Sequence, residues 1–170
     1  MAIAGRHLPR AATMDWLTPR SIVDELGPFD MDPCTPHVMP WRTAARMLTS
    51  DDDGLKTQWI GRVWLNPPYG RDIGAWVRKL AEHGDGIALT FARVDTAWWA
   101  RWVWPTADAV LFPVGRITFC LPTGDAAGNN SGGPSAFIAY GERNVTSLRR
   151  LACVRGALIT RTGGWHGGGV

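Results

Sequence analysis

The stretch Asn66-Pro67-Pro68-Tyr69 constrains the fold of this chain more than any other part of the sequence. It follows the apolar run 62–65, which is typical of a short strand. Its two prolines remove two backbone donors and fix two φ angles, so the strand must end here. The end presents an amide side chain, carbonyls with no neighbouring N–H and an aromatic ring. Such an edge suits a flat substrate that carries an exocyclic amine, although a Pro-rich turn by itself can also end a strand.

The length and composition favour one globular domain. A chain of 170 residues is long enough to bury a full hydrophobic core. Its 45% hydrophobic and 19% charged residues argue against wholesale disorder, and every apolar run is too short to cross a bilayer. We expect a flexible leader over 1–15, one domain over 16–162 and a flexible tail over 163–170. The leader lacks the apolar core of a secretory signal, so we expect a cytoplasmic protein.

The cysteines and histidines do not form the pattern of a disulfide framework or a metal site. Cys34, Cys120 and Cys153 are odd in number and widely spaced, so we expect reduced thiols. His37 has no second ligand at a suitable spacing, and no metal is expected.

Arginine carries almost all of the positive charge. The formal net charge is +3, and Lys56 and Lys79 are the only lysines. Arginine grips phosphate through two parallel hydrogen bonds, so the composition favours a polyanionic partner. Codon bias in a GC-rich genome explains the same composition, and both explanations stay open here.

Apolar strands and amphipathic helices alternate along the chain. Helices are expected after the capping residues Thr18, Asp72 and Asp95 and over 145–154, and the weakly patterned 41–48 is a candidate for a short one. Pro19 suits the first helical position after Thr18. Strands are predicted over 29–32, 62–65, 86–92, 109–114, 117–121, 134–140 and 157–160.

This order of elements describes an open α/β sheet that is mostly parallel and has an antiparallel end. The runs 117–121 and 134–140 flank the Gly-, Asn- and Ser-rich stretch 123–133, so we expect them to pair as a terminal hairpin. Ligands of such sheets bind beyond the carboxyl ends of the strands. Asp32 and Asn66 each follow a strand, and we expect them to face one crevice.

These motifs, in this order and spacing, resemble the phage-type DNA N6-adenine methyltransferase (Dam) family, whose members use S-adenosylmethionine. The resemblance extends from about residue 16 to about residue 150. Besides the Asn66 motif, it rests on Thr18-Pro19, Phe29-Asp30-Met31-Asp32-Pro33, Asp53-Gly54-Leu55 with Trp59, Ala92-Arg93-Val94-Asp95-Thr96 with Trp98-Trp99, Gly115-Arg116 with Phe119, and Pro134-Ser135-Ala136. It implies a Rossmann-like methyltransferase fold for the domain over 16–162.

The sequence departs from that family pattern on the cofactor side. The glycine-rich turn that usually follows the first strand is not visible between Leu26 and Phe29. Asp32 and Asn66 are also only 34 positions apart, too few for the complete run from the first to the fourth strand. We therefore expect the strand over 29–32 to be the second strand of the usual fold, with the first strand shortened or lost.

The resemblance implies methyl transfer to the N6 amine of adenine in DNA, with the target base flipped out of the duplex. The Asn66 side-chain oxygen and the Pro67 carbonyl would each accept one N6 hydrogen. Pro68 belongs to the same rigid motif, and Tyr69 would stack on the base. The sulfonium is an activated methyl donor, so neither a metal nor a covalent nucleophile is required.

The resemblance also implies contacts to the cofactor. Asp32 would accept hydrogen bonds from the ribose hydroxyls, and Asp53 would accept one from the adenine amine, with Asp51 and Asp52 as competitors. Thr18-Pro19 would touch the carboxylate end of the cofactor. Capping roles for Asp32 and Thr18, and a solvated loop for the three aspartates, are the structural alternatives.

DNA contacts are expected from basic and amide side chains beside these motifs. Arg71, Arg93 and Arg116 are candidates to bind phosphate, and Asn129 and Asn130 are candidates to read adenine in a groove, because asparagine can do so with two hydrogen bonds. A slack glycine-rich loop is the alternative for the two asparagines.

The tryptophans divide into two groups. Trp76, Trp98 and Trp102 fall at helical spacing on apolar faces and are predicted to be core residues. Trp16 and Trp41 are candidates to line the site.

Other functions fit the same motif. It also serves methylation of cytosine N4, of RNA bases or of a glutamine amide in a protein, and a degenerate, non-catalytic DNA-binding module is the alternative from a different class. We expect a monomer or weak dimer with DNA as partner, in the host cytoplasm if the gene belongs to a phage.

Overall fold

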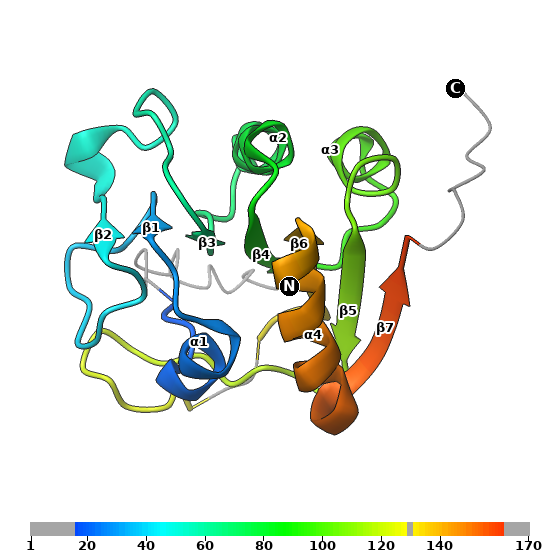
Figure 1. The fold of residues 1–170 in the computed structure, drawn as a ribbon. Helices are drawn as coiled ribbons and strands as arrows, with labels where there is room; N and C mark the ends of the chain where they lie inside the picture. The colour runs from blue at the N-terminus through cyan, green and yellow to red at the C-terminus, as the bar shows by residue number, and fades with distance from the viewer. Residues whose placement is uncertain (1–15, 129–130, 162–170) are drawn as a thin grey trace, which may run out of the picture.

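The computed structural model describes residues 16–128 and 131–161. The predicted leader 1–15, the predicted tail 163–170, and Asn129 and Asn130 lie outside the described residues. Within the described part, a seven-stranded sheet has helices on both of its faces (Figure 1).

The strands follow the spatial order β2-β1-β3-β4-β6-β5-β7. They are β1 (Met31–Asp32), β2 (Arg46–Met47), β3 (Val63–Leu65), β4 (Gly86–Phe91), β5 (Ala109–Pro113), β6 (Ser135–Tyr140) and β7 (Gly156–Thr160). The helices are α1 (Arg20–Leu26), α2 (Ile73–His83), α3 (Ala97–Trp102) and α4 (Glu142–Arg155), with one 3-10 turn, η1 (Ser50–Asp52). No described helix has both the length and the apolar character needed to span a membrane.

The sheet has a parallel half and an antiparallel half. Strands β2, β1, β3 and β4 pair in parallel, whereas β6 is antiparallel to β4 and β5, and β7 is antiparallel to β5. The expectation of a mostly parallel sheet is therefore wrong in its proportion. The antiparallel end exists, and it is as large as the parallel part.

The predicted terminal hairpin is also wrong. The stretch 117–121 forms no strand and pairs only through isolated bridges of Cys120 with Leu17 and Ala126. Instead, β6 inserts between β4 and β5, where all six of its residues are buried. A six-residue apolar strand gains most from a central position covered on both faces, and the side chains of Ile117 and Phe119 join the core without strand pairing.

Strand β1 lies directly beside β3, and Met31 is paired with Val63. In the doubly wound order 3-2-1-4-5-6, the neighbour of the fourth strand is the first strand. The position of β1 is thus that of a first strand, and β2 has the position of the second. The assignment of the 29–32 run to the second strand is corrected accordingly.

Several local expectations change for the same reason, which is that backbone pairing outweighs weak local signals. The stretch 41–48 contains β2 and no helix, because Arg46 and Leu48 donate to the carbonyls of Asp30 and Asp32 at 2.8 Å each. Neither Thr18 nor Asp95 caps a helix, since the N-cap positions are Pro19 and Thr96. Asp72 is at the N-cap of α2, but its side chain makes no capping hydrogen bond.

Two hydrophobic clusters, one on each face of the sheet, hold the fold together. Helices α1 and α4 cover one face, with Leu26 and Leu148 fully buried, and α2 and α3 cover the other, with Leu80 and Trp99 fully buried (Figure 1). Each such side chain stabilises the fold by about 1.5–3 kcal/mol. Trp76 is in the core as predicted, and Trp98 and Trp102 pack against it partly buried.

Candidate active site

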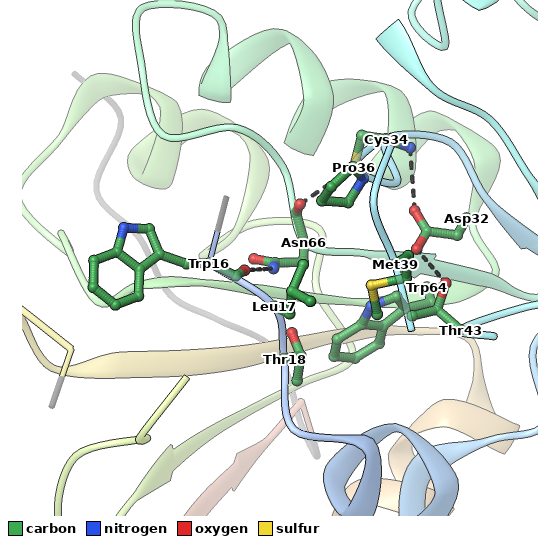
Figure 2. Close-up of a pocket in the computed structure, with 10 residues that line it drawn as sticks. All are labelled: Trp16, Leu17, Thr18, Asp32, Cys34, Pro36, Met39, Thr43, Trp64 and Asn66. Carbon is green, nitrogen blue, oxygen red and sulfur yellow. Dashed lines mark hydrogen bonds between the residues drawn. The ribbon is translucent and has the colours of Figure 1, made fainter. Parts of the chain in front are cut away.

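The carboxyl ends of the parallel strands gather the predicted site residues at one edge of the sheet. A pocket at this edge contains both Asp32, the last residue of β1, and Asn66, which follows β3, as the strand-end argument predicts (Figure 2). Its lining consists of Trp16, Leu17, Thr18, Asp32, Cys34, Pro36, Met39, Thr43, Trp64 and Asn66. The free volume inside is about 20 Å³, which is room for roughly one water molecule.

The side chain of Asn66 has one satisfied group and one unsatisfied group. Its Nδ2 donates to the backbone carbonyl of Trp16 at 3.2 Å (Figure 2), whereas its Oδ1 is buried without a hydrogen-bond partner. A carbonyl oxygen can only accept, so the contact with Trp16 fixes which end of the amide is the nitrogen. The site therefore contains a buried acceptor that lacks a donor.

A chain of hydrogen bonds links Asn66 to Asp32. The Cys34 thiol donates to the Asn66 backbone carbonyl at 3.3 Å, and the Cys34 backbone N–H donates to Asp32 Oδ1 at 3.1 Å (Figure 2). Thr43 Oγ1 donates to the other oxygen of Asp32. Burial, and then the nearby Asp32 charge, raises the pKa of Cys34 well above its usual value, so the thiol stays protonated and acts as a donor.

Asp32 is a buried carboxylate with an altered pKa. Burial raises its pKa to about 6, and the hydrogen bonds from Thr43 and Cys34 oppose that rise. Its side chain is ionised above that pH and can then accept further hydrogen bonds, because a carboxylate has about four acceptor positions.

Thr18 contributes a second unsatisfied group to the pocket. Its Oγ1 is buried without a partner. The neighbouring Leu17 exchanges two backbone hydrogen bonds with Cys120, at 3.0 and 2.8 Å, so the segment 16–18 is tied to the 117–121 segment. Pro19 comes next, at the N-cap of α1, and is not part of the pocket lining.

Tyr69 is turned toward β4. Its ring stacks on Phe91, with 4.4 Å between centroids and 24° between planes, and its hydroxyl is buried without a partner. Burial raises the pKa of Tyr69. Within the motif, Pro67 is buried and Pro68 is exposed.

Phe91 also borders a second, larger hollow. This hollow has a volume of about 230 Å³ and is lined by Phe91, Ala92, Arg93 and the segment 132–134. It lies at the same edge of the sheet, since β4 ends and the antiparallel β6 begins there. The Tyr69–Phe91 stack therefore connects the Asn66 motif to this hollow.

The three aspartates after β2 have different partners. Asp52 Oδ2 accepts from the N–H and the hydroxyl of Thr49, at 2.8 and 3.2 Å, and so caps η1. Asp51 lies 3.6 Å from His37, and Asp53 pairs with Lys56 at 2.6 Å. None of them lines the pocket, but Gly54 packs against Pro33, where an added Cβ would lie 1.9 Å from the Pro33 carbonyl oxygen.

The predicted DNA-binding arginines are all exposed and lie outside the first pocket. Arg93 lines the second hollow, and Arg116 donates to the Ser131 carbonyl at 3.2 Å. Arg71 follows the Asn66 motif and lines neither hollow. Within 16–128 and 131–161, no group of three or more His, Cys, Asp or Glu side chains is placed to hold a metal ion.

Sequence reasoning missed several residues of the site. Trp16 was a candidate and does line the pocket. It contacts Asn66 through its backbone carbonyl, which every residue has, so the sequence could not predict this contact. Cys34, Thr43 and Phe91 were not singled out for this edge. Cys34 is two positions after Asp32, and Phe91 lies near the end of the predicted strand 86–92, directly before Ala92-Arg93, so both could have drawn attention, whereas Thr43 gave no signal. Trp41 does not line this pocket.

Comparison with known proteins gives one match. The family model described as DNA N-6-adenine-methyltransferase (Dam) matches residues 5–161. No curated protein and no solved structure matches the chain.

Proposed function

The chain belongs to the DNA N-6-adenine-methyltransferase (Dam) family, and we propose that it transfers a methyl group from S-adenosylmethionine to adenine N6 at Asn66-Pro67-Pro68-Tyr69. Membership in the family implies the reaction and the DNA substrate. The assignment of roles to individual residues is our proposal.

The unsatisfied Asn66 Oδ1 is the observation that carries this assignment. A buried acceptor without a donor destabilises a protein by about 1–3 kcal/mol, and the Trp16 carbonyl prevents the amide from turning to another partner. An adenine amine supplies the missing N–H. The fold therefore keeps in place an acceptor that no group of the protein satisfies.

The acceptors make the N6 amine a better nucleophile. Its lone pair is delocalised into the adenine ring, and hydrogen bonds to both N6 hydrogens favour the tetrahedral nitrogen of the transition state. Asn66 Oδ1 accepts one hydrogen and the Pro67 carbonyl accepts the other. Because the prolines fix the backbone, both acceptors are oriented before the substrate arrives.

The polar groups of the pocket fit S-adenosylmethionine chemically. Thr18 Oγ1 lacks a partner and Asp32 has acceptor capacity left, so Thr18, with Pro19 beside it, would contact the carboxylate end and Asp32 the ribose hydroxyls. Asp53, on the loop that packs against Pro33, would accept from the cofactor adenine. The bound sulfonium supplies an activated methyl group. Since the free volume is only about 20 Å³, the pocket lining must open for the cofactor to enter.

The DNA side of the proposal uses the same edge of the sheet. An adenine in a duplex must flip out to reach Asn66, and Tyr69, whose ring stacks on Phe91, is the proposed aromatic surface for the base. Arg71, Arg93 and Arg116 are exposed beside the motif and the second hollow, where they can bind phosphates. Asn129 and Asn130 remain candidates for base reading.

The test is incubation of the purified chain with methyl-labelled S-adenosylmethionine and unmethylated duplex DNA. Digestion of the DNA should give labelled N6-methyladenine. Label in N4-methylcytosine, in RNA or in a protein glutamine would assign the motif to another amine, and a folded, cofactor-binding protein that labels nothing contradicts the proposal.

Titration calorimetry with S-adenosylmethionine separates an enzyme from a non-catalytic DNA-binding module. Saturable binding at a stoichiometry of one is the expected result. If DNA binds and the cofactor does not, the chain is a module without catalytic function.

A further inference from the structure

Both lysines of the chain form polar contacts with one loop, the acidic loop, defined here as residues 51–57: Lys56 from within it and Lys79 from outside it. Lys79 Nζ donates to three backbone carbonyls, those of Gly54, Leu55 and Thr57, at 3.2, 2.6 and 2.6 Å. Lys56 pairs with Asp53 within the loop. The Lys79 ammonium thus uses all three of its N–H donors on one loop.

Lys79 reaches the loop from helix α2 and occupies a partly desolvated position. Its Nζ lies 5.2 Å from the ring centroid of Trp59, whose Nε1 donates to the Gly54 carbonyl at 2.8 Å. Trp59 in turn stacks on Trp76 of α2, with 6.2 Å between centroids. Burial lowers the pKa of Lys79, so the fold disfavours the charge at this position and compensates with three carbonyls.

The loop lies against the backbone of the proposed cofactor site. Any side chain at Gly54 would collide with the Pro33 carbonyl and with the Trp76 ring, at 1.9 and 3.0 Å. A shift of the acidic loop therefore changes the surroundings of Asp32, which precedes Pro33. Helix α2 begins at Ile73, just after the Asn66 motif, so Lys79 connects the acceptor side of the site to the cofactor side.

We propose that Lys79 is a positioning residue, whose three carbonyl bonds set the place of Asp53 and Gly54 relative to Asp32 and thereby the affinity for the nucleoside part of S-adenosylmethionine. The inference rests on the proposed function, because it assigns Asp53 to the cofactor. Lysine suits the task better than arginine. An ammonium directs three donors at converging carbonyls, whereas a planar guanidinium cannot.

The choice of lysine is informative in this chain. Of 18 basic residues, only Lys56 and Lys79 are lysines. A preference for arginine set by codon usage would not single out these two positions, which contact the same loop.

The experiment compares Lys79→Met, Lys79→Arg and Lys79→Gln with the wild type in the full chain. Methionine keeps an apolar stem over Trp59 and removes the donors. Arg78→Met is the matched control, since Arg78 is on the same helix and pairs with Glu82 at 2.7 Å, away from the loop. Calorimetry gives the Kd for S-adenosylmethionine, turnover gives its KM and kcat, and anisotropy gives the Kd for DNA.

For Lys79→Met we expect the cofactor Kd and KM to rise about tenfold or more. A tenfold rise corresponds to about 1.4 kcal/mol, roughly the net free energy of one charge-assisted hydrogen bond that orders the loop. The kcat at saturating cofactor and the DNA Kd should stay within about twofold of the wild type, because Asn66 and the arginines are untouched. Lys79→Arg should bind the cofactor no more tightly than Lys79→Met. The Kd of Lys79→Gln should lie between those of the wild type and Lys79→Met, and the Kd of Arg78→Met should equal that of the wild type.

Other outcomes overturn the inference. An unchanged cofactor Kd in Lys79→Met, with or without a lower Tm, means that Lys79 only stabilises the fold, and full rescue by arginine means that only the charge matters. If Lys79→Met is too unstable to assay, Lys79→Gln carries the same comparison. A wild type that binds the cofactor but does not label DNA refutes the proposed function and leaves this inference standing, whereas a wild type that does not bind the cofactor refutes both.

Discussion

The two edges of the sheet treat polar groups in opposite ways. At the amino edge, a charged residue precedes each of four strands: Asp30, Arg62, Asp85 and Asp108. Each of the four has a hydrogen-bond partner. The Arg62 guanidinium makes three such bonds, to Asn144 Oδ1, the Pro28 carbonyl and Ser147 Oγ, at 2.6, 3.0 and 2.9 Å. At the carboxyl edge, buried polar atoms lack partners in Thr18, Asn66, Tyr69, Thr90 and Ser135.

This difference separates stability from function along the strand direction. A paired group at the amino edge lowers the free energy of the fold, whereas an unpaired group at the carboxyl edge raises it. Unpaired groups can persist where a ligand supplies the partner, so the contrast supports the proposal that the site lies at the carboxyl edge. It also predicts that substitutions at the two edges have different effects.

The largest expected effect is loss of activity in Asn66→Ala. Removing the acceptor should lower kcat by about 10²- to 10³-fold, the usual effect of losing one transition-state hydrogen bond. The free energy of unfolding should fall by no more than about 1 kcal/mol, because Oδ1 has no protein partner and the change loses only the hydrogen bond from Nδ2 to the Trp16 carbonyl. Asn66→Asp, which keeps an acceptor, should retain more activity than Asn66→Ala, and turnover of the alanine variant within tenfold of wild type would remove Asn66 from the mechanism.

The opposite pattern is expected for Arg62→Met at the amino edge. The change leaves Asn144 Oδ1, the Pro28 carbonyl and Ser147 Oγ without this donor and should lower the free energy of unfolding by about 3 kcal/mol. Urea denaturation measures the loss. Arg149→Met, at an exposed pair with Glu142, is the control and should change stability by less than about 0.5 kcal/mol. Comparable losses of unfolding free energy in Arg62→Met and Arg149→Met would show that the hydrogen bonds of Arg62 contribute no more to stability than an exposed ion pair does.

The Asp32 carboxyl should make the carboxyl edge sensitive to pH. Its folded pKa of about 6 is above the ordinary value of 3.8, so its contribution to stability is fully present below about pH 4 and is lost as the pH rises through 6. Asp32→Asn should therefore be more stable than wild type at pH 8, by about 1–3 kcal/mol, and equal to it near pH 4. Denaturation at both pH values tests the sign, and a less stable asparagine variant at pH 8 would contradict it.

The smallest expected effects come from removing one hydroxyl at each edge. Thr18→Val deletes an unpaired Oγ1 and should raise the free energy of unfolding by up to about 1 kcal/mol while weakening cofactor binding. Ser147→Ala deletes one of the acceptors of Arg62 and should lower the free energy of unfolding by about 1 kcal/mol. Thermal unfolding of the two variants decides the comparison, and the same sign in both would refute the contrast between the edges.

The sequence was a good guide to elements with strong local signals and a poor guide to their neighbours in space. Periodicity located α2, α4, β4 and β7, and the two prolines located the end of β3. The same reasoning predicted a helix where β2 lies and a hairpin that does not form. Comparison with the family pattern also placed the 29–32 run second in the sheet, because the glycine-rich turn of a first strand is not visible and no local signal says which strand lies beside another.

The site divides in the same way. The sequence by itself determined that Asn66 follows a strand, that the prolines fix its backbone and that Asp32 follows another strand, since these depend on restricted φ angles and alternation within a few residues. Only the tertiary structure decided that the Trp16 carbonyl orients Asn66, that Asp52 caps a turn while Asp53 pairs with Lys56, and that Lys79 holds their loop. The Trp16 and Lys79 contacts join residues far apart in the chain, and they form only where burial of the two faces of the sheet repays the entropy of closing the loops between them. The contacts of Asp52 and Asp53 span three positions, but three consecutive aspartates give the same local signal, so only the structure shows which partner each one takes.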